Sequence, residues 1–194
     1  MIIAIGNGES RKNIDLNSIA TKKIGCNAIY RDFDVDHLIC VDKRMVLEAL
    51  ESNANNNSLI YTRKDLFTRF PTKRIRQVPP LPYASYESAD VPKNWGSGPY
   101  AVLLSAIKTD DDSVGLLGFD LYGIDDKTNN IYKDTTNYNV SDKKAINPSY
   151  WIHQIGMVFK CFPNVQFTIY QEQGWQKPKA WKQPNVTVDT ISNL

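Results

Sequence analysis

Short apolar runs alternate along this chain with segments of helical spacing. The first run, Met1–Ile5, ends at Gly6, and further runs cover residues 24–29, 37–41, 58–62, 113–119 and 165–170. Continuous apolar runs of this length are typical of strands buried on both faces, as in a parallel sheet. The apolar spacing and the prolines predict helices over residues 43–53, 99–108 and 148–161.

Four other segments lack such a pattern. Residues 63–95 contain five prolines, which exclude a long helix there. Residues 11–20 predict a short helix or turn, and the Asn-rich residues 53–57 are expected to end the helix before them. The polar residues 123–147 predict a long loop or lid, and the tail from Gln171 predicts an extended flap.

Strands that alternate with helices predict an α/β fold. We expect a three-layer, Rossmann-like architecture with a mostly parallel sheet, helices on both faces and a lid at 123–147. A length of 194 residues is that of one domain, 1–194. In such folds ligands bind beyond the carboxyl ends of the strands, so the residues after Ile5, Ile29, Val41 and Phe119 are the candidates for a site.

Composition narrows the function classes. The 23 Lys and Arg residues nearly balance the 21 Asp and Glu residues, so the net charge of +2 gives no strong attraction to nucleic acid or to an anionic membrane. No apolar run approaches the roughly 20 residues of a membrane span, and the N-terminus lacks the pattern of a signal peptide. The three cysteines form no Cys-x-x-Cys pair, which argues against a zinc ribbon or redox dithiol. We expect buried free thiols and a cytoplasmic protein.

Two charged segments invite a functional interpretation. Asp32, Asp34 and Asp36 alternate, but an EF-hand loop from Asp32 would need glycine and glutamate where the chain has His37 and Lys43. A solvated loop is the favoured interpretation, and an Asp-x-Asp that binds a metal with a nucleotide sugar is the alternative. On the favoured interpretation no metal is expected. Residues 63–76 carry six cations against one aspartate, which suits a solvated surface or a patch for an anionic acceptor or nucleic acid.

Candidate binding residues follow the first strands. Gly6 and Gly8 allow a tight turn that approaches a phosphate, although Arg11 stands where a G-x-G-x-x-G motif has its third glycine. A plain strand-to-helix turn is the alternative. Asn27 could bind a ribose, a phosphate or a base edge, and Asp42 could accept hydrogen bonds from sugar hydroxyls. Asn27 could equally be a turn residue and Asp42 a helix N-cap.

His153 is the candidate general base, because histidine titrates near neutral pH. A structural histidine beside Tyr150 and Trp151 is the alternative.

Several of these signals occur in the order found in a known family. Gly6-Asn7-Gly8-Glu9-Ser10, Gly25-Cys26-Asn27, Ser97-Gly98, Gly118–Tyr122 and His153 together resemble the bacterial lipooligosaccharide sialyltransferases, which use CMP-sialic acid and have a Rossmann-like domain with a lid. Glu9 replaces a proline of the family motif, Gly25 an arginine, and Asp42 an asparagine.

The resemblance implies a role for each matching residue. Asn7, Gly8 and Asn27 would contact the nucleotide and its phosphate, with Ser97 and Gly98 near the cytidine. Tyr122 and Tyr132 would donate hydrogen bonds to the departing phosphate, and His153 would deprotonate the acceptor hydroxyl. The family works without a metal or other cofactor.

The sequence therefore predicts a glycosyltransferase of sialyltransferase type, which transfers a sugar from a CMP-linked nucleotide sugar to a hydroxyl of a glycan or other acceptor. The Gly-x-Gly-x-Ser opening is also similar to that of the archaeal-type hydroxymethylpterin diphosphokinases. A protein of that type, or a nucleotide-binding module without turnover, is the alternative. Association into a homo-oligomer is compatible with either.

Overall fold

Eight parallel strands form a single sheet in the order β5-β4-β3-β2-β1-β6-β7-β8. The structure is a computed structural model that describes residues 1–52, 58–84 and 87–194. The strands are β1 (Ile2–Ile5), β2 (Lys22–Cys26), β3 (His37–Ile39), β4 (Leu59–Thr62), β5 (Ile75–Gln77), β6 (Ser113–Leu117), β7 (Gln166–Gln171) and β8 (Val186–Thr190). The prediction of an α/β fold with a parallel sheet is confirmed.

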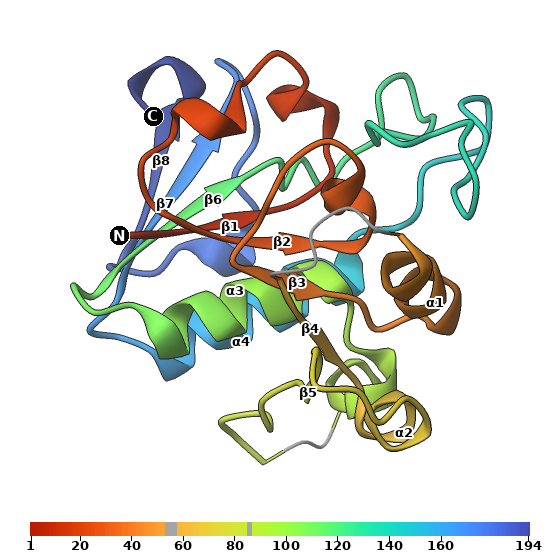
Figure 1. The fold of residues 1–194 in the computed structure, drawn as a ribbon. Coiled ribbons are helices and arrows are strands. Elements are labelled where there is room, and N and C mark those ends of the chain that lie inside the picture. The colour runs from red at the N-terminus through yellow and green to blue at the C-terminus, as the bar shows by residue number, and fades with distance from the viewer. Residues whose placement is uncertain (53–57, 85–86) are drawn as a thin grey trace.

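Four α-helices connect or flank these strands. They are α1 (Lys43–Glu51), α2 (Lys64–Arg69), α3 (Ser97–Lys108) and α4 (Ser149–Cys161), and short 3-10 turns fill several connections. In Figure 1, α3 and α4 lie side by side along the same side of the central strands. The predicted helices over 43–53, 99–108 and 148–161 are thus present, with the end of the first at Glu51; the Asn-rich residues 53–57 lie outside the described residues.

The two faces of the sheet pack into separate hydrophobic clusters. Ile2 and Ala4 of β1 belong to one cluster together with apolar residues of α3 and α4. Ile3 and Ile5 belong to the other, with residues of α1 and of the 3-10 turns after β1 and β2. Because successive side chains of a strand point to opposite faces, this division of β1 accounts for a strand with four buried residues. The arrangement is three-layered.

The strand order places a topological switch next to β1. From β1 the chain moves outward through β2, β3, β4 and β5, and it then returns to the other side of β1 with β6. In open parallel sheets the crevice that binds ligands lies at the carboxyl ends of the strands beside such a switch, so this is where a site is expected.

Both edge strands differ from the sequence prediction. The tail after Gln171 is not an extended flap, because its residues 186–190 pair with β7 as β8, and Trp181 is fully buried. At the other edge, β5 lies within the segment 63–95 that showed no pattern, and only Ile75 of this strand is buried. Edge strands are covered less completely than central ones, so they lack the apolar runs by which the central strands were recognised.

Residues 123–147 contain no helix or strand and are linked by turns and two isolated bridges. This segment, blue-green in Figure 1, extends as irregular loops beyond the right-hand ends of the central strands, which agrees with the predicted loop or lid. Cys26 and Cys40 are buried free thiols, as expected. Among the described residues, no helix has the length and apolar character needed to cross a membrane.

Candidate functional site

A cavity of about 520 Å³ occupies the crevice at the switch. Its walls come from the loops after β1, β2, β3 and β6, from the N-terminus of α3, from the lid and from Trp151 and Ile155 of α4. Of the residues predicted from the sequence, the cavity is lined by Gly6, Asn7, Gly8, Asn27, Asp42, Ser97, Gly98 and Tyr122. The structure thus brings together five stretches that are far apart along the chain.

The two glycines after β1 are required by packing against the end of β6. A Cβ atom on Gly6 would lie 2.3 Å from the carbonyl oxygen of Gly118, and one on Gly8 would lie 2.2 Å from the carboxyl carbon of Asp120. Gly6 also donates a backbone hydrogen bond to Leu117 (2.8 Å). The close approach of the two loops therefore explains these glycines without any ligand.

Asp120 occupies the position where this turn could have bound a phosphate. Its carboxylate accepts hydrogen bonds from the backbone N–H of Ser10 (3.0 Å) and from the Ser10 hydroxyl (2.5 Å). The Gln171 amide donates a third (3.3 Å). Ser10, predicted as a substrate-binding residue, is thus bonded to Asp120 and does not line the cavity.

The Asn7 side chain lines the cavity, but its polar atoms are used within the protein. Its Nδ2 donates to the carbonyl of Cys26 (3.1 Å) and to the Tyr138 hydroxyl (3.2 Å), and its Oδ1 accepts from Arg11 (3.2 Å). Arg11 is itself 2 % exposed and donates to the carbonyl of Gly6 (2.7 Å). Asn7 therefore joins β1, β2 and the lid.

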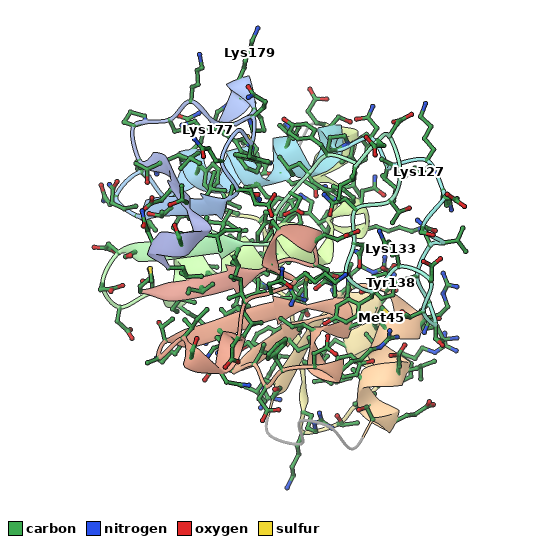
Figure 2. All side chains as sticks on the ribbon, turned by 90° about the horizontal axis from the view of Figure 1, so that it is seen from above. Met45, Lys127, Lys133, Tyr138, Lys177 and Lys179 are labelled. Carbon is green, nitrogen blue, oxygen red and sulfur yellow. The ribbon has the colours of Figure 1, made fainter. Side chains whose placement is uncertain are left out.

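Glu9 faces the lid, which removes its charge from the cavity. Its carboxylate pairs with Lys133 (2.6 Å), and its backbone N–H donates to Asn129 (2.9 Å). Ile131 adds a backbone bond to Asn7 (2.9 Å). Lys133 and Tyr138 of the lid are labelled in Figure 2. Glu9 thus serves as a contact between the turn after β1 and the lid.

Glu48 of α1 holds the opposite end of the lid. Its carboxylate accepts hydrogen bonds from Tyr30 (2.6 Å), Arg31 (2.7 Å) and Asn137 of the lid (2.7 Å). Burial acts to raise the pKa of Glu48, but these hydrogen bonds and the Arg31 charge outweigh it, so that the pKa lies below its ordinary value. Arg31 also donates to the lid residue Thr135 (2.8 Å).

The N-terminus of α3 opens into the cavity through Ser97 and Gly98. Asn27, whose φ of 52° lies in the left-handed region that asparagine tolerates, accepts a hydrogen bond from the Ser97 hydroxyl through Oδ1 (2.8 Å). In the described chain, the backbone N–H groups of Ser97 and Gly98 and the Nδ2 of Asn27 make no hydrogen bond. Unpaired N–H groups at a helix N-terminus carry partial positive charge, so this corner of the cavity favours an anion.

Asp42 and Arg44 are exposed at the β3 side of the cavity. Asp42 is at the N-cap position of α1, as the alternative interpretation predicted, but its side chain makes no capping hydrogen bond. Within the described residues its carboxylate accepts no hydrogen bond, so it can accept hydrogen bonds from a ligand. Together with Asp120, these are the charged residues of the described cavity wall, two acids and one base.

The two tyrosines predicted to hold a leaving phosphate lie in different places. Tyr122 lines the cavity and is partly exposed, and burial raises the pKa of its hydroxyl, which keeps it a hydrogen-bond donor at neutral pH. Tyr132, a lid residue, is 4 % exposed within the core cluster, where Arg11 lies over its ring and donates a hydrogen bond to its hydroxyl (3.3 Å). Tyr132 does not line the cavity, whereas the lid residue Tyr138 does.

His153 also lies outside the cavity wall. Its Nε2 is 2.9 Å from Oδ1 of Asp90, which also accepts a hydrogen bond from Tyr83 (2.7 Å). Trp151 and Ile155 of the same helix do line the cavity. Residues two apart on a helix are separated by about 200° around its axis, so a helix that presents Trp151 to the cavity turns His153 away. This geometry matches the structural interpretation of the histidine.

Sequence reasoning missed Arg44, Asp120, Tyr138 and Trp151. The helical spacing of Trp151 and Ile155 could have identified the face of α4 that meets the strand ends. No sequence signal singled out Tyr138 within the lid. The basic segment 63–76 forms α2 and β5 near one edge of the sheet, and none of its residues lines the cavity. No group of His, Cys, Asp and Glu residues in the described ranges is arranged to hold a metal ion.

Comparisons of the chain with protein-family models, with curated proteins and with solved structures gave no match.

Proposed function

We propose that the cavity binds a nucleotide that carries a single phosphate, and that the protein is a glycosyltransferase of sialyltransferase type with a CMP-linked sugar as donor. The observation that carries this proposal is the N-terminus of α3, where Ser97 and Gly98 line a cavity at the switch of a parallel sheet and their N–H groups have no partner in the described chain. This is where Rossmann-like folds bind nucleotides.

The charge of the cavity favours a monophosphate. A helix N-terminus offers about half an elementary charge, which suits one phosphodiester. A diphosphate or triphosphate would need several cations or a metal, whereas Arg44 is the one cation in the described wall and Asp42 and Asp120 oppose it. This balance is consistent with a CMP-linked donor.

The cavity suggests an orientation for such a donor. With the phosphate at Ser97 and Gly98, the free carboxylate of Asp42 can accept hydrogen bonds from ribose hydroxyls on the β3 side. The sugar then points toward Tyr122 on the β6 side. The Tyr122 hydroxyl can donate a hydrogen bond to a phosphate oxygen as the bond between phosphate and sugar breaks. His153 has no part in this proposal, because it is bonded to Asp90 outside the cavity.

Replacing Asn27 by aspartate tests the phosphate position with little change of shape. Oδ1 can still accept from Ser97, whereas the free Nδ2 becomes a carboxylate oxygen beside the proposed phosphate. We expect CMP to raise the melting temperature of the wild type, and Asn27→Asp to weaken CMP binding about tenfold or more through like-charge repulsion. Asn164→Asp, at an exposed asparagine outside the cavity, is the matched control and should bind CMP normally. Equal CMP affinity of Asn27→Asp and the wild type would refute this phosphate position.

A nucleotide-binding module without turnover is the second candidate, and the position of His153 favours it, since the expected base is not at the cavity. Incubation with CMP-sialic acid and an acceptor glycan separates the two. Release of CMP with formation of a sialylated product supports the transferase. Binding of CMP without product supports the module, and stabilisation by ATP with Mg²⁺ alone would favour the diphosphokinase-like alternative.

A further inference from the structure

A second cavity, of about 370 Å³, lies on the β7 side of the first. Asp120, Tyr122, Gly123 and Asn129 line both cavities, so the two share a wall. The rest of the second cavity is formed by the turn after β1, by the lid residue Ile124, by Gln171 at the end of β7 and by Glu172, Gln173 and Trp175 after it. None of the residues predicted from the sequence to bind the donor, apart from Ser10 and Tyr122, lies here.

Two aromatic rings form one side of this cavity. The ring centroids of Tyr122 and Trp175 are 6.4 Å apart, with an angle of 42° between the ring planes. The Trp175 indole donates a hydrogen bond to the carbonyl of Asp120 (2.9 Å) and packs against the buried Trp181, so its orientation is fixed. Partly exposed aromatic rings held in this way offer an apolar surface at no further ordering cost.

Polar groups without partners stand beside these rings. Glu172 and Gln173 are exposed, and in the described chain their side chains make no hydrogen bond. A sugar ring has one face of C–H groups, which packs on aromatic rings, and a rim of hydroxyls, which bonds with amides and carboxylates. The combination of rings and free hydrogen-bonding groups fits this chemistry.

The charged residues of the cavity wall restrict the ligand further. They are Glu9, Asp120 and Glu172, all acidic, and no cation belongs to the described wall. Glu9 is paired with Lys133, and Asp120 is bonded to Ser10, whereas Glu172 is free. A carboxylate or phosphate on the ligand would be repelled, so an uncharged ligand is favoured.

We infer that the second cavity is a binding site for an uncharged saccharide, held on the Tyr122–Trp175 rings and by Glu172 and Gln173. Saccharide binding at this place does not depend on the donor cavity. Its assignment as the acceptor rests on the proposed function, with Tyr122 between the two sugars.

Saturation-transfer NMR with lactose, maltose and N,N′-diacetylchitobiose as probes tests this inference. At least one of these uncharged disaccharides should bind in the millimolar range, and the double variant Glu172→Ala/Gln173→Ala should lower its affinity about tenfold by removing two hydrogen-bonding groups. Both residues are exposed and unbonded, so the fold should tolerate the change. Phe67→Ala, at an exposed ring on α2, is the matched control and should bind as the wild type does. The anionic 3′-sialyllactose should bind more weakly than lactose, if lactose is the ligand.

Absence of binding by all three disaccharides, or equal affinity in the double variant and the wild type, would overturn the saccharide site. Measuring CMP binding on the same samples separates this result from the proposed function. CMP binding without saccharide binding would refute the saccharide site and leave the proposed function intact. Saccharide binding without CMP binding would support the saccharide site and refute its assignment as the acceptor site.

Discussion

Replacing Gly6 by alanine is expected to separate the carboxyl ends of β1 and β6. The new Cβ atom would lie 2.3 Å from the carbonyl oxygen and 2.9 Å from the carbonyl carbon of Gly118, which are backbone atoms. They cannot move by a change of rotamer. The loops after the two strands must therefore shift, and the hydrogen bonds from Gly6 to Leu117 (2.8 Å) and from Gly8 to Gly118 (2.9 Å) are strained together.

The size of the effect follows from these two contributions. Overpacking of a filled interior costs about 1–3 kcal/mol, and the loss of two backbone hydrogen bonds adds about 1 kcal/mol each. We therefore expect Gly6→Ala to lower the free energy of unfolding by about 3–5 kcal/mol, a large part of the stability of a typical domain.

Urea unfolding followed by circular dichroism measures this loss. Gly156→Ala is the matched control, because this buried glycine lies inside α4 and its new Cβ would make an ordinary contact of 3.4 Å with Trp181. The control should be neutral or gain up to about 1 kcal/mol from helix propensity. A Gly6→Ala protein within about 0.5 kcal/mol of the wild type would show that the ends of β1 and β6 separate easily, and packing would no longer explain the glycine.

Two further predictions concern the lid. Tyr138→Phe removes the hydroxyl that accepts hydrogen bonds from Asn7 and Ala28, so the free energy of unfolding should fall by about 1–3 kcal/mol. Proteolysis within residues 123–147 should become faster. An unchanged cleavage rate would show that these two hydrogen bonds do not hold the lid in place. Because the folded protein holds the pKa of Glu48 below its ordinary value of 4.5, its carboxylate stabilises the fold above that pH, and this contribution is lost as the pH falls through the folded-state pKa. Urea unfolding should therefore show Glu48→Gln clearly less stable than the wild type at pH 7, with the difference shrinking as the pH is lowered below 4.5, whereas a difference that stays constant with pH would refute the linkage.

Much of the fold could be predicted from local patterns. The apolar runs identified all of the central strands, and helical spacing with well-placed prolines identified α1, α3 and α4. These elements are buried, so their side chains are mostly apolar and the pattern can be recognised in the sequence. The edge strands β5 and β8 were missed, because only part of each is buried and neither shows a continuous apolar run.

The candidate site could be predicted only in part. The rule that ligands bind at the carboxyl ends of parallel strands led to Asn27 and Asp42, and the family resemblance led to Ser97; the cavity does bring the three together. The sequence could not show that Asn7 is used to join strands and lid, since its partners Arg11, Cys26 and Tyr138 meet it only in the folded chain.

The sequence by itself determined the layered α/β architecture and the parallel sheet, because these follow from periodicity along the chain, and with them the strand ends at which the cavity lies. Only the tertiary structure decided which polar groups remain free at that place. It turned His153 toward Asp90, placed the Asp120 carboxylate over the glycine turn and left the N-terminus of α3 open. The physical reason is that a hydrogen-bonding group is available to a ligand only when no other part of the protein satisfies it, and the partners that do so here lie 63 and 110 residues away along the chain.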